Sequence, residues 1–173
     1  MKKFIWVAVA LSLGAWSSQA QQISRGDVSA GYSFIRSGGV NLNGFNTTAA
    51  YNANDWFGVV GDLGVYHGSP GGVGVTALTY TFGPRFSVHK SDKIVPFAQA
   101  LVGGSHISAS FGGFSGSTNP FAFILGGGAD VALTGSGRVS LRPEFDYFGL
   151  RAGGATGNGF RISAAIVYHF GQR

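Results

Sequence analysis

The sequence contains no cysteine, and charged residues are scarce in it. Without cysteine the chain has neither a disulfide framework nor a site for a cysteine-linked lipid anchor, which excludes a disulfide-stapled secreted domain and a lipoprotein. Charged residues make up 11% of the chain, whereas a soluble domain carries about 25%. Hydrophobic residues make up 45% and aromatic residues 14%. A chain this poor in charge is poorly suited to remain in water.

Long apolar runs and good helix formers are also rare after the first 20 residues. No apolar run there approaches the roughly 20 residues that a membrane-spanning helix needs. The 30 glycines of the chain favour closely packed strands and turns over helices. The sequence therefore predicts an all-β protein.

The first 20 residues have the three parts of a secretion signal. Lys2 and Lys3 form a positive start, residues 4–16 form a short apolar run, and residues 18–20 form a small-x-small cleavage site. We therefore predict a cleavable signal peptide at residues 1–20. Residues 21–173 then form a single exported domain.

The last strand-like segment, residues 159–170, alternates between two faces. One face is apolar throughout and ends in aromatic side chains; it comprises Phe160, Ile162, Ala164, Ile166, Tyr168 and Phe170. At about 3.3 Å per residue such a strand is long enough to cross a bilayer at a tilt. Because the backbone of a lone strand finds no hydrogen-bond partners in hydrocarbon, the rest of the chain must supply strands that close a barrel.

Seven earlier segments share this period of two. With the last one they cover residues 28–36, 44–52, 56–67, 74–88, 94–107, 121–133, 138–150 and 159–170. An even number of strands without intervening helices predicts an eight-stranded antiparallel up-and-down transmembrane β-barrel. We expect the termini on the periplasmic side of an outer membrane. The Gly- and Ser-rich residues 108–118 are expected to form the longest loop, and residues 152–157 another loop.

Large apolar side chains occupy one face of most strands, and polar or charged side chains occupy the other. In residues 56–67 the alternation predicts Leu63 on the outer face, with Trp56 and Asp62 on the inner face. In residues 94–107 the faces are not clear, because Phe97 and Gln99 have the same parity. A soluble lipid-binding barrel, the alternative, would have its apolar residues inside. Aromatic residues near both strand ends, as at two bilayer interfaces, favour the membrane barrel.

Several predicted inner faces carry charge. The residues concerned are Asp62, Arg85, Arg142, Glu144, Asp146 and Arg161. An eight-stranded barrel is only wide enough to be filled by side chains, and buried charges persist when they are paired. We therefore expect a polar, salt-bridged and plugged interior in which Arg161 meets Glu144 or Asp146. A narrow path for protons or small solutes is the alternative.

Three stretches carry a family resemblance: YNANDWFGVVGD at residues 51–62, FGPRFS at 82–87 with KSDKIVPFA at 90–98, and FILGGGAD at 123–130. With the even strand spacing they resemble the small outer-membrane β-barrel family of Gram-negative bacteria, of OmpX or OmpA-barrel type, and within it an opacity-protein-like, porin-like subfamily. The resemblance implies an architecture without a reaction. It also implies that the barrel-assembly machinery recognises the C-terminal strand, here with Tyr168 and Phe170.

From this resemblance we expect a structural or surface-interaction protein of the cell envelope. Its partners would be outer-membrane lipid and lipopolysaccharide, together with the assembly machinery during biogenesis. We expect a monomer that is not an enzyme.

One motif supports an enzymatic alternative. His106 and Ser108 have the His-x-Ser spacing of outer-membrane lipid A deacylases, and alternation places both on one face. A membrane-embedded lipid A acyl hydrolase would also need an acid behind the histidine, whereas Glu144 and Asp146 have inward parity. A polar rim at the end of a strand is the simpler explanation of the pair, and the hydrolase is the alternative.

The remaining motifs indicate no cofactor, metal or nucleic acid. Residues 72–77 match Gly-x-Gly-x-x-Ala by letters, but no helix is predicted after them to hold a pyrophosphate. The histidines are scattered and lack the spacing of metal ligands; they are His67, His89, His106 and His169. The formal net charge of +5 comes from dispersed cations, two of them in the predicted signal.

Overall fold

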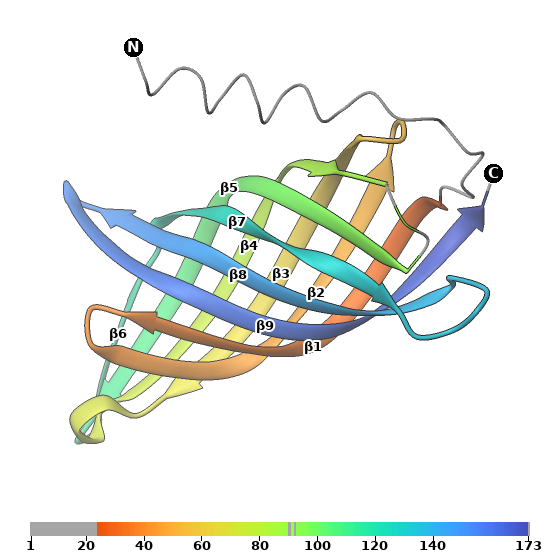
Figure 1. The fold of residues 1–173 in the computed structure, drawn as a ribbon. Helices are drawn as coiled ribbons and strands as arrows, with labels where there is room; N and C mark the ends of the chain where they lie inside the picture. Colours follow the sequence, from red (N-terminus) through yellow and green to blue (C-terminus); the bar gives the residue numbers. More distant parts are fainter. Residues whose placement is uncertain (1–23, 90, 92, 173) are drawn as a thin grey trace, which may run out of the picture.

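The computed structural model describes residues 24–89, 91 and 93–172. The predicted signal peptide, residues 1–20, lies outside the described residues. Within them the strands run obliquely around a common axis and form one barrel (Figure 1). No helix in the described part of the chain is long and apolar enough to cross a membrane.

The described strands are β1 (Ser24–Ser37), β2 (Val40–Asn52), β3 (Phe57–Gly68), β4 (Gly74–Ser87), β5 (Ile94–Phe111), β6 (Phe114–Thr118), β7 (Phe121–Ala132), β8 (Val139–Ala152) and β9 (Ala155–Gln172). A short 3-10 helix, η1 (Pro70–Gly72), lies between β3 and β4. Every strand pairing is antiparallel, and the sheet order is β4-β3-β2-β1-β9-β8-β7-β5-β6.

Two pairings close this sheet into a ring. β4 pairs with β5, and the last strand β9 pairs with both β1 and β8, so that Ala164 lies between Tyr32 and Pro143. The short strand β6 pairs with the outer end of β5 and extends the hairpin beyond the ring. The predicted eight-stranded antiparallel up-and-down barrel is therefore confirmed.

Alternate residues of the strands face the interior and the exterior. On β8 the buried residues Arg142, Glu144 and Asp146 alternate with the exposed residues Leu141 and Phe145. On β9 the exposed face from Phe160 to Phe170 is about 33 Å long, and its height at the usual strand tilt is about 25 Å. This height matches the apolar band of outer-membrane barrels.

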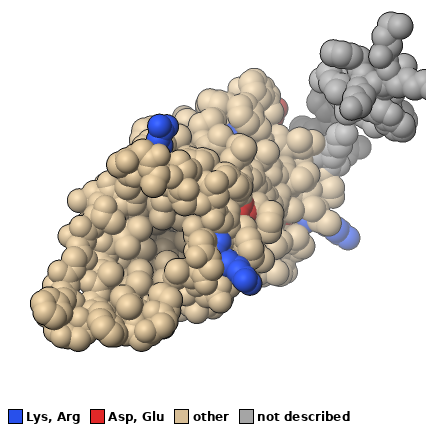
Figure 2. Space-filling model, turned by 90° about the vertical axis from the view of Figure 1, so that its left-hand side faces the viewer, with Lys and Arg blue, Asp and Glu red and all other residues tan. Residues whose placement is uncertain are grey.

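The exterior is apolar over most of its area. Its large exposed side chains include Phe45, Tyr51, Leu63, Val65, Tyr80, Phe82, Leu125, Phe145, Ile162, Ile166, Tyr168 and Phe170. Figure 2 shows one side of the molecule, on which the charged side chains occupy only small patches. In water such a surface would be an aggregation hazard, whereas in a bilayer it is the expected exterior.

The structure settles one face assignment that was unclear and corrects another. Phe97 and Gln99, which left the faces of β5 unclear, both point into the barrel and are buried. The prediction that Trp56 faces inward is wrong: it precedes β3, is 59% exposed and stacks on Phe86 with ring centroids 6.0 Å apart. Because Trp56 belongs to the turn, the alternation of the strand does not govern it.

The end of the barrel opposite the termini has shorter loops than predicted. The predicted loop at residues 108–118 is wrong, since β5 continues to Phe111 and β6 begins at Phe114; the loop at 152–157 is likewise reduced to the link between Ala152 and Ala155. Each link is a Gly-Gly pair with positive φ, such as Gly112 at 55° and Gly113 at 86°. Because two such residues form a turn that matches the twist of a hairpin, the flanking residues remain paired.

Candidate functional site

The barrel interior gathers the charged residues that the sequence singled out. All of them are buried: Asp62, Arg85, Arg142, Glu144, Asp146 and Arg161 are at most 4% exposed. They lie on β3, β4, β8 and β9, and the ion pairs of the described residues fall into two clusters. We name these the Arg161 cluster and the Arg142 cluster.

The Arg161 cluster lies in the middle of the barrel. Arg161 Nη1 donates to the two carboxylate oxygens of Asp62, at 3.0 and 2.9 Å, and Arg161 Nε donates to Asp146 Oδ2 at 2.9 Å. Asp146 is the cross-strand neighbour of Arg161, whereas Asp62 reaches it from β3, across the interior. Glu144 is more distant, with its Oε2 atom 3.9 Å from Arg161 Nη2 and 3.0 Å from Ser163 Oγ.

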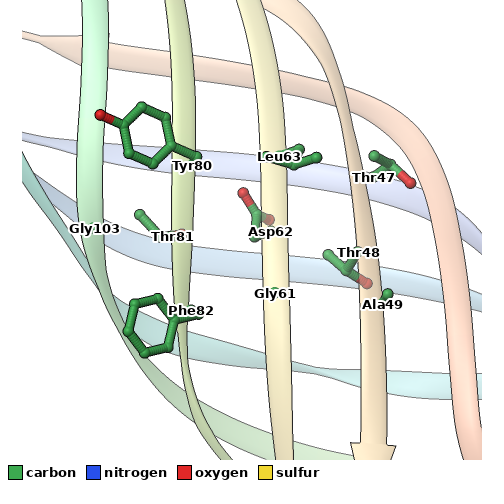
Figure 3. A pocket seen from close by; sticks show the side chains of 10 residues that line it. All are labelled: Thr47, Thr48, Ala49, Gly61, Asp62, Leu63, Tyr80, Thr81, Phe82 and Gly103. Carbon is green, nitrogen blue, oxygen red and sulfur yellow. The ribbon is translucent and has the colours of Figure 1, made fainter.

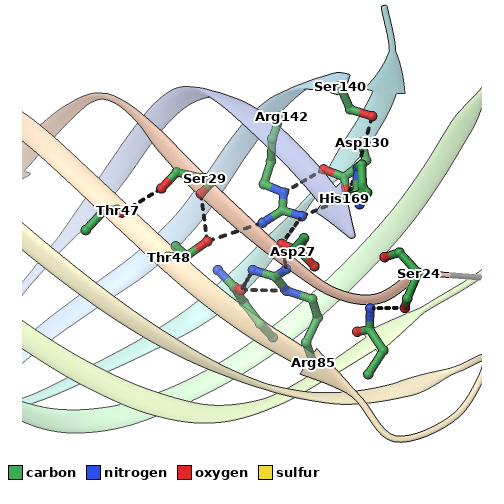
Figure 4. A network of polar contacts seen from close by, with 12 residues as sticks. Ser24, Asp27, Ser29, Thr47, Thr48, Arg85, Asp130, Ser140, Arg142 and His169 are labelled. Atoms are coloured by element: carbon green, nitrogen blue, oxygen red, sulfur yellow. Dashed lines mark hydrogen bonds and ion pairs between the residues drawn. The ribbon is translucent and has the colours of Figure 1, made fainter. Parts of the chain in front are cut away.

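The Arg142 cluster lies closer to the chain termini (Figure 4). Arg142 Nη2 donates to Asp27 Oδ1 at 2.9 Å and to Asp130 Oδ2 at 2.7 Å. Arg85 Nη1 is 3.4 Å from the same Asp27 oxygen. The ring of Phe97 lies beneath both guanidinium groups, 4.6 Å from Arg85 and 5.2 Å from Arg142. Asp27 on β1 therefore joins cations from β4 and β8.

Asp27 and Asp130 of the Arg142 cluster are not among the site residues predicted from the sequence. Asp27 has the same parity as the buried Ser29, and Asp130 has the opposite parity to the apolar face of β7. Both carboxylates were therefore recognisable as inward residues by alternation. The contact between Arg142 and Asp27 could not be predicted from the sequence, because β9 lies between their strands in the sheet.

The two clusters differ in charge balance. In the Arg142 cluster the arginines Arg85 and Arg142 face the carboxylates of Asp27 and Asp130. In the Arg161 cluster a single guanidinium serves three carboxylates, those of Asp62, Glu144 and Asp146. The negative charge of the Arg161 cluster is therefore balanced within the cluster by Arg161 alone.

An apolar layer fills the interior beyond the charges. The inward residues of β8 are, in order away from the termini, Ser140, Arg142, Glu144, Asp146, Phe148 and Leu150. Around Phe148 pack buried side chains from several strands, which include Ile35, Tyr66, Ala77, Leu101 and Ile124. The expectation of a polar interior therefore holds for the two charge clusters and is wrong for this end of the barrel, which we name the apolar layer.

A hollow of about 350 Å³ lies on the exterior (Figure 3). It lies over Gly61, where an added Cβ would meet nothing within 4 Å, and beside Leu63, Tyr80 and Phe82. Of its lining residues only Asp62 is charged, and that carboxylate is bonded to Arg161 inside the barrel. The hollow has no set of polar groups that would hold a polar ligand.

His106 and Ser108 lie together on the exterior, near the outer end of β5. Ser108 Oγ is 3.3 Å from His106 Nε2, and His106 Nδ1 is 2.7 Å from Oδ1 of Asn119, which follows β6. Glu144 and Asp146 are buried inside the barrel and do not supply the acid. Asn119 was not predicted as a site residue, because it lies 13 residues from His106 in a segment predicted to border a loop.

Tyr168 and Phe170 lie on the exterior near the C-terminal end of β9, where they are 49% and 45% exposed. Tyr168 is the cross-strand neighbour of Val28 and Val139.

No group of three or more His, Asp or Glu side chains among the described residues could hold a metal ion.

No protein-family model matches the chain, and no curated protein matches it by sequence. Solved structures do match it. Neisserial surface protein A has 16% identity and a TM-score of 0.66, over 84% of this chain and 96% of that one. Ail, the attachment invasion locus protein of Yersinia pestis, has 19% identity and a TM-score of 0.57, over 84% and 99%. The N-terminal β-barrel domain of OprF from Pseudomonas aeruginosa has 13% identity and a TM-score of 0.61, over 86% and 100%.

The chain therefore has the fold of the small outer-membrane β-barrels of Gram-negative bacteria. The shared fold and the apolar exterior together indicate the bacterial outer membrane as its location.

Proposed function

We propose that this protein is an integral outer-membrane barrel with a sealed interior, which serves the cell envelope as a structural or surface-interaction protein and does not conduct solutes. The observation that carries the proposal is the filling of the interior by two charge clusters and the apolar layer. Arg142, Arg161 and Tyr66 are each at most 1% exposed, although they lie at different depths. Water that entered from either end would meet packed side chains.

The orientation is suggested by the β5–β6 hairpin, which extends beyond the ring at the end opposite the termini, because outer-membrane barrels extend farther on the extracellular side. We place the termini on the periplasmic side, where Tyr168 and Phe170 would be available to the barrel-assembly machinery. The Gly-Gly turns would then face outward, and the signal peptide would have been removed on export. Outer-membrane lipid and lipopolysaccharide would surround the apolar exterior of a monomer.

A surface-interaction role would use the β5–β6 hairpin. Its tip carries Phe111 and Phe114, which are 62% and 83% exposed. The outward turns after β1 and β8 present little side-chain area, because each is reduced to a Gly-Gly pair, and the β3–β4 connection is a short 3-10 turn. The neighbour Ail is named as an attachment protein, which is consistent with such a role for a barrel of this fold.

Electrical recording in planar bilayers tests the sealed interior. Refolded protein that shows heat-modifiable migration on gels, and is therefore a folded barrel, is expected to give no stepwise conductance. A variant with Tyr66→Ala and Phe148→Ala removes the two largest rings of the apolar layer. Its conductance shows whether the charge clusters alone block the passage of ions. Regular conductance steps from the unaltered protein would contradict the proposal.

A further inference from the structure

The exterior of the barrel carries a chain of polar side chains that the sealed-barrel function does not use. We propose that Ser108, His106 and Asn119 form a serine esterase site that acts on ester-linked acyl chains of membrane lipids. The inference rests on the contacts among these residues and on their position relative to the apolar band. It goes beyond the sealed barrel and does not depend on the interior.

Local structure holds the three residues in place. The alternation of β5 puts His106 and Ser108 on the same outward face, two residues apart. The chain returns through β6, and a hydrogen bond of 3.0 Å from the Ser105 backbone N–H to the Pro120 carbonyl fixes the segment that carries Asn119 beside His106. The carbonyl oxygen Oδ1 of Asn119 then lies 2.7 Å from His106 Nδ1.

These contacts select one state of the histidine ring. An amide oxygen only accepts hydrogen bonds, so Asn119 Oδ1 requires the proton on His106 Nδ1. His106 Nε2 is then an acceptor and faces Ser108 Oγ at 3.3 Å. This is the order of nucleophile, base and orienting group that hydrolases on unrelated folds share, including those in which asparagine orients the histidine.

The reaction that this order supports is ester hydrolysis. Ser108 Oγ attacks the ester carbonyl carbon while its proton passes to His106 Nε2, which then protonates the departing alcohol. Water attacks the acyl-serine next, gives a proton to His106 Nε2 and releases the fatty acid as Ser108 regains its proton. The net change is ester plus water to acid plus alcohol.

The position of the site indicates the substrate class. The cross-strand neighbours on β4 are Leu78 for His106 and Thr76 for Ser108. Thr76 in turn is hydrogen-bonded to His67 on β3, with 3.1 Å between Thr76 Oγ1 and His67 Nδ1. Polar residues therefore begin where the apolar band ends, which is the depth at which acyl chains are esterified to a lipid headgroup.

Other serines of the hairpin provide a matched control. Ser110 is exposed and lies two residues beyond Ser108 on the same face. Within the described residues its hydroxyl has no histidine partner at hydrogen-bond distance, unlike that of Ser108. A reaction that needs only an exposed serine would therefore occur at both positions.

The test uses the refolded barrel in detergent with a fluorophosphonate probe and p-nitrophenyl decanoate. We expect covalent labelling at Ser108, complete loss of labelling in Ser108→Ala and unchanged labelling in Ser110→Ala. His106→Ala should slow both reactions by about 10²- to 10⁴-fold, the usual contribution of a general base. Absence of labelling in heat-modifiable protein, or equal labelling of Ser108→Ala, would overturn the site and leave the sealed barrel unaffected.

Asn119 is a positioning residue, and a conservative variant separates this role from a purely structural one. Asn119→Ala should lose labelling, whereas Asn119→Asp keeps an oxygen that accepts from His106 Nδ1 and should label at Ser108. Equal labelling in the Asn119→Ala variant and the unaltered protein would contradict the role assigned to Asn119.

Discussion

Arg161→Ala is expected to lower the free energy of unfolding by about 3–5 kcal/mol, the usual cost of removing one partner from a buried ion pair. Arg161 is fully buried and holds Asp62 and Asp146 through three hydrogen bonds. Its loss would leave the buried carboxylates of Asp62 and Asp146 without their ion-pair partner. Urea unfolding in lipid vesicles, followed by gel migration, measures the change.

The matched control is Arg151→Ala, because Arg151 lies near the outer end of the neighbouring strand β8 and is exposed. This variant should change the unfolding free energy by less than about 1 kcal/mol, as is usual for exposed charges. Arg161→Met combined with Asp62→Asn and Asp146→Asn should recover much of the stability, since it removes the cation together with the two carboxylates that are hydrogen-bonded to it. Equal stability of Arg161→Ala and Arg151→Ala would show that the Arg161 cluster does not hold the barrel together.

Leu63→Arg is expected to destabilise the barrel by about 2–4 kcal/mol in a bilayer, the cost of a cation on the lipid face near the midplane. Leu63 is 54% exposed and lies between Val59 and His67 on the outward face of β3. In a soluble barrel the same substitution at an exposed position would be nearly neutral. Unfolding titrations in vesicles measure the difference.

His67→Arg provides the control on the same strand and face. His67 is exposed near the outer end of β3, where the cost of an arginine should fall to about 0–1 kcal/mol. Equal and small effects at Leu63 and His67 would contradict the membrane depth assigned to β3.

The sequence was sufficient to predict the barrel and most of its faces, because strand alternation is a local signal. On β9 the pattern from Phe160 to Phe170 is the one the structure shows. The signal failed where a residue leaves the strand, as Trp56 does. It also failed where composition suggested a loop, because the Gly-Gly pair at Gly112 and Gly113 allows the flanking Ser- and Gly-rich residues to stay paired.

The candidate site could be predicted only in part. Alternation identified the inward charges, and the pairing of Arg161 with Asp146 follows from adjacent strands. The contact of Arg161 with Asp62 crosses the interior, and the contact of His106 with Asn119 depends on the β5–β6 hairpin. Such partners depend on barrel closure and register, which a single sequence does not specify.

The central claim is that the apolar face lies against lipid while the charges lie inside. Tryptophan fluorescence in vesicles of brominated lipid tests it most directly, because Trp56 is the sole tryptophan of residues 21–173. In a variant with Trp56→Phe and Leu63→Trp, the account predicts strong quenching by bromine near the ends of the acyl chains and weaker quenching by bromine near the headgroup. Fluorescence unaffected by bromine at either depth would contradict it.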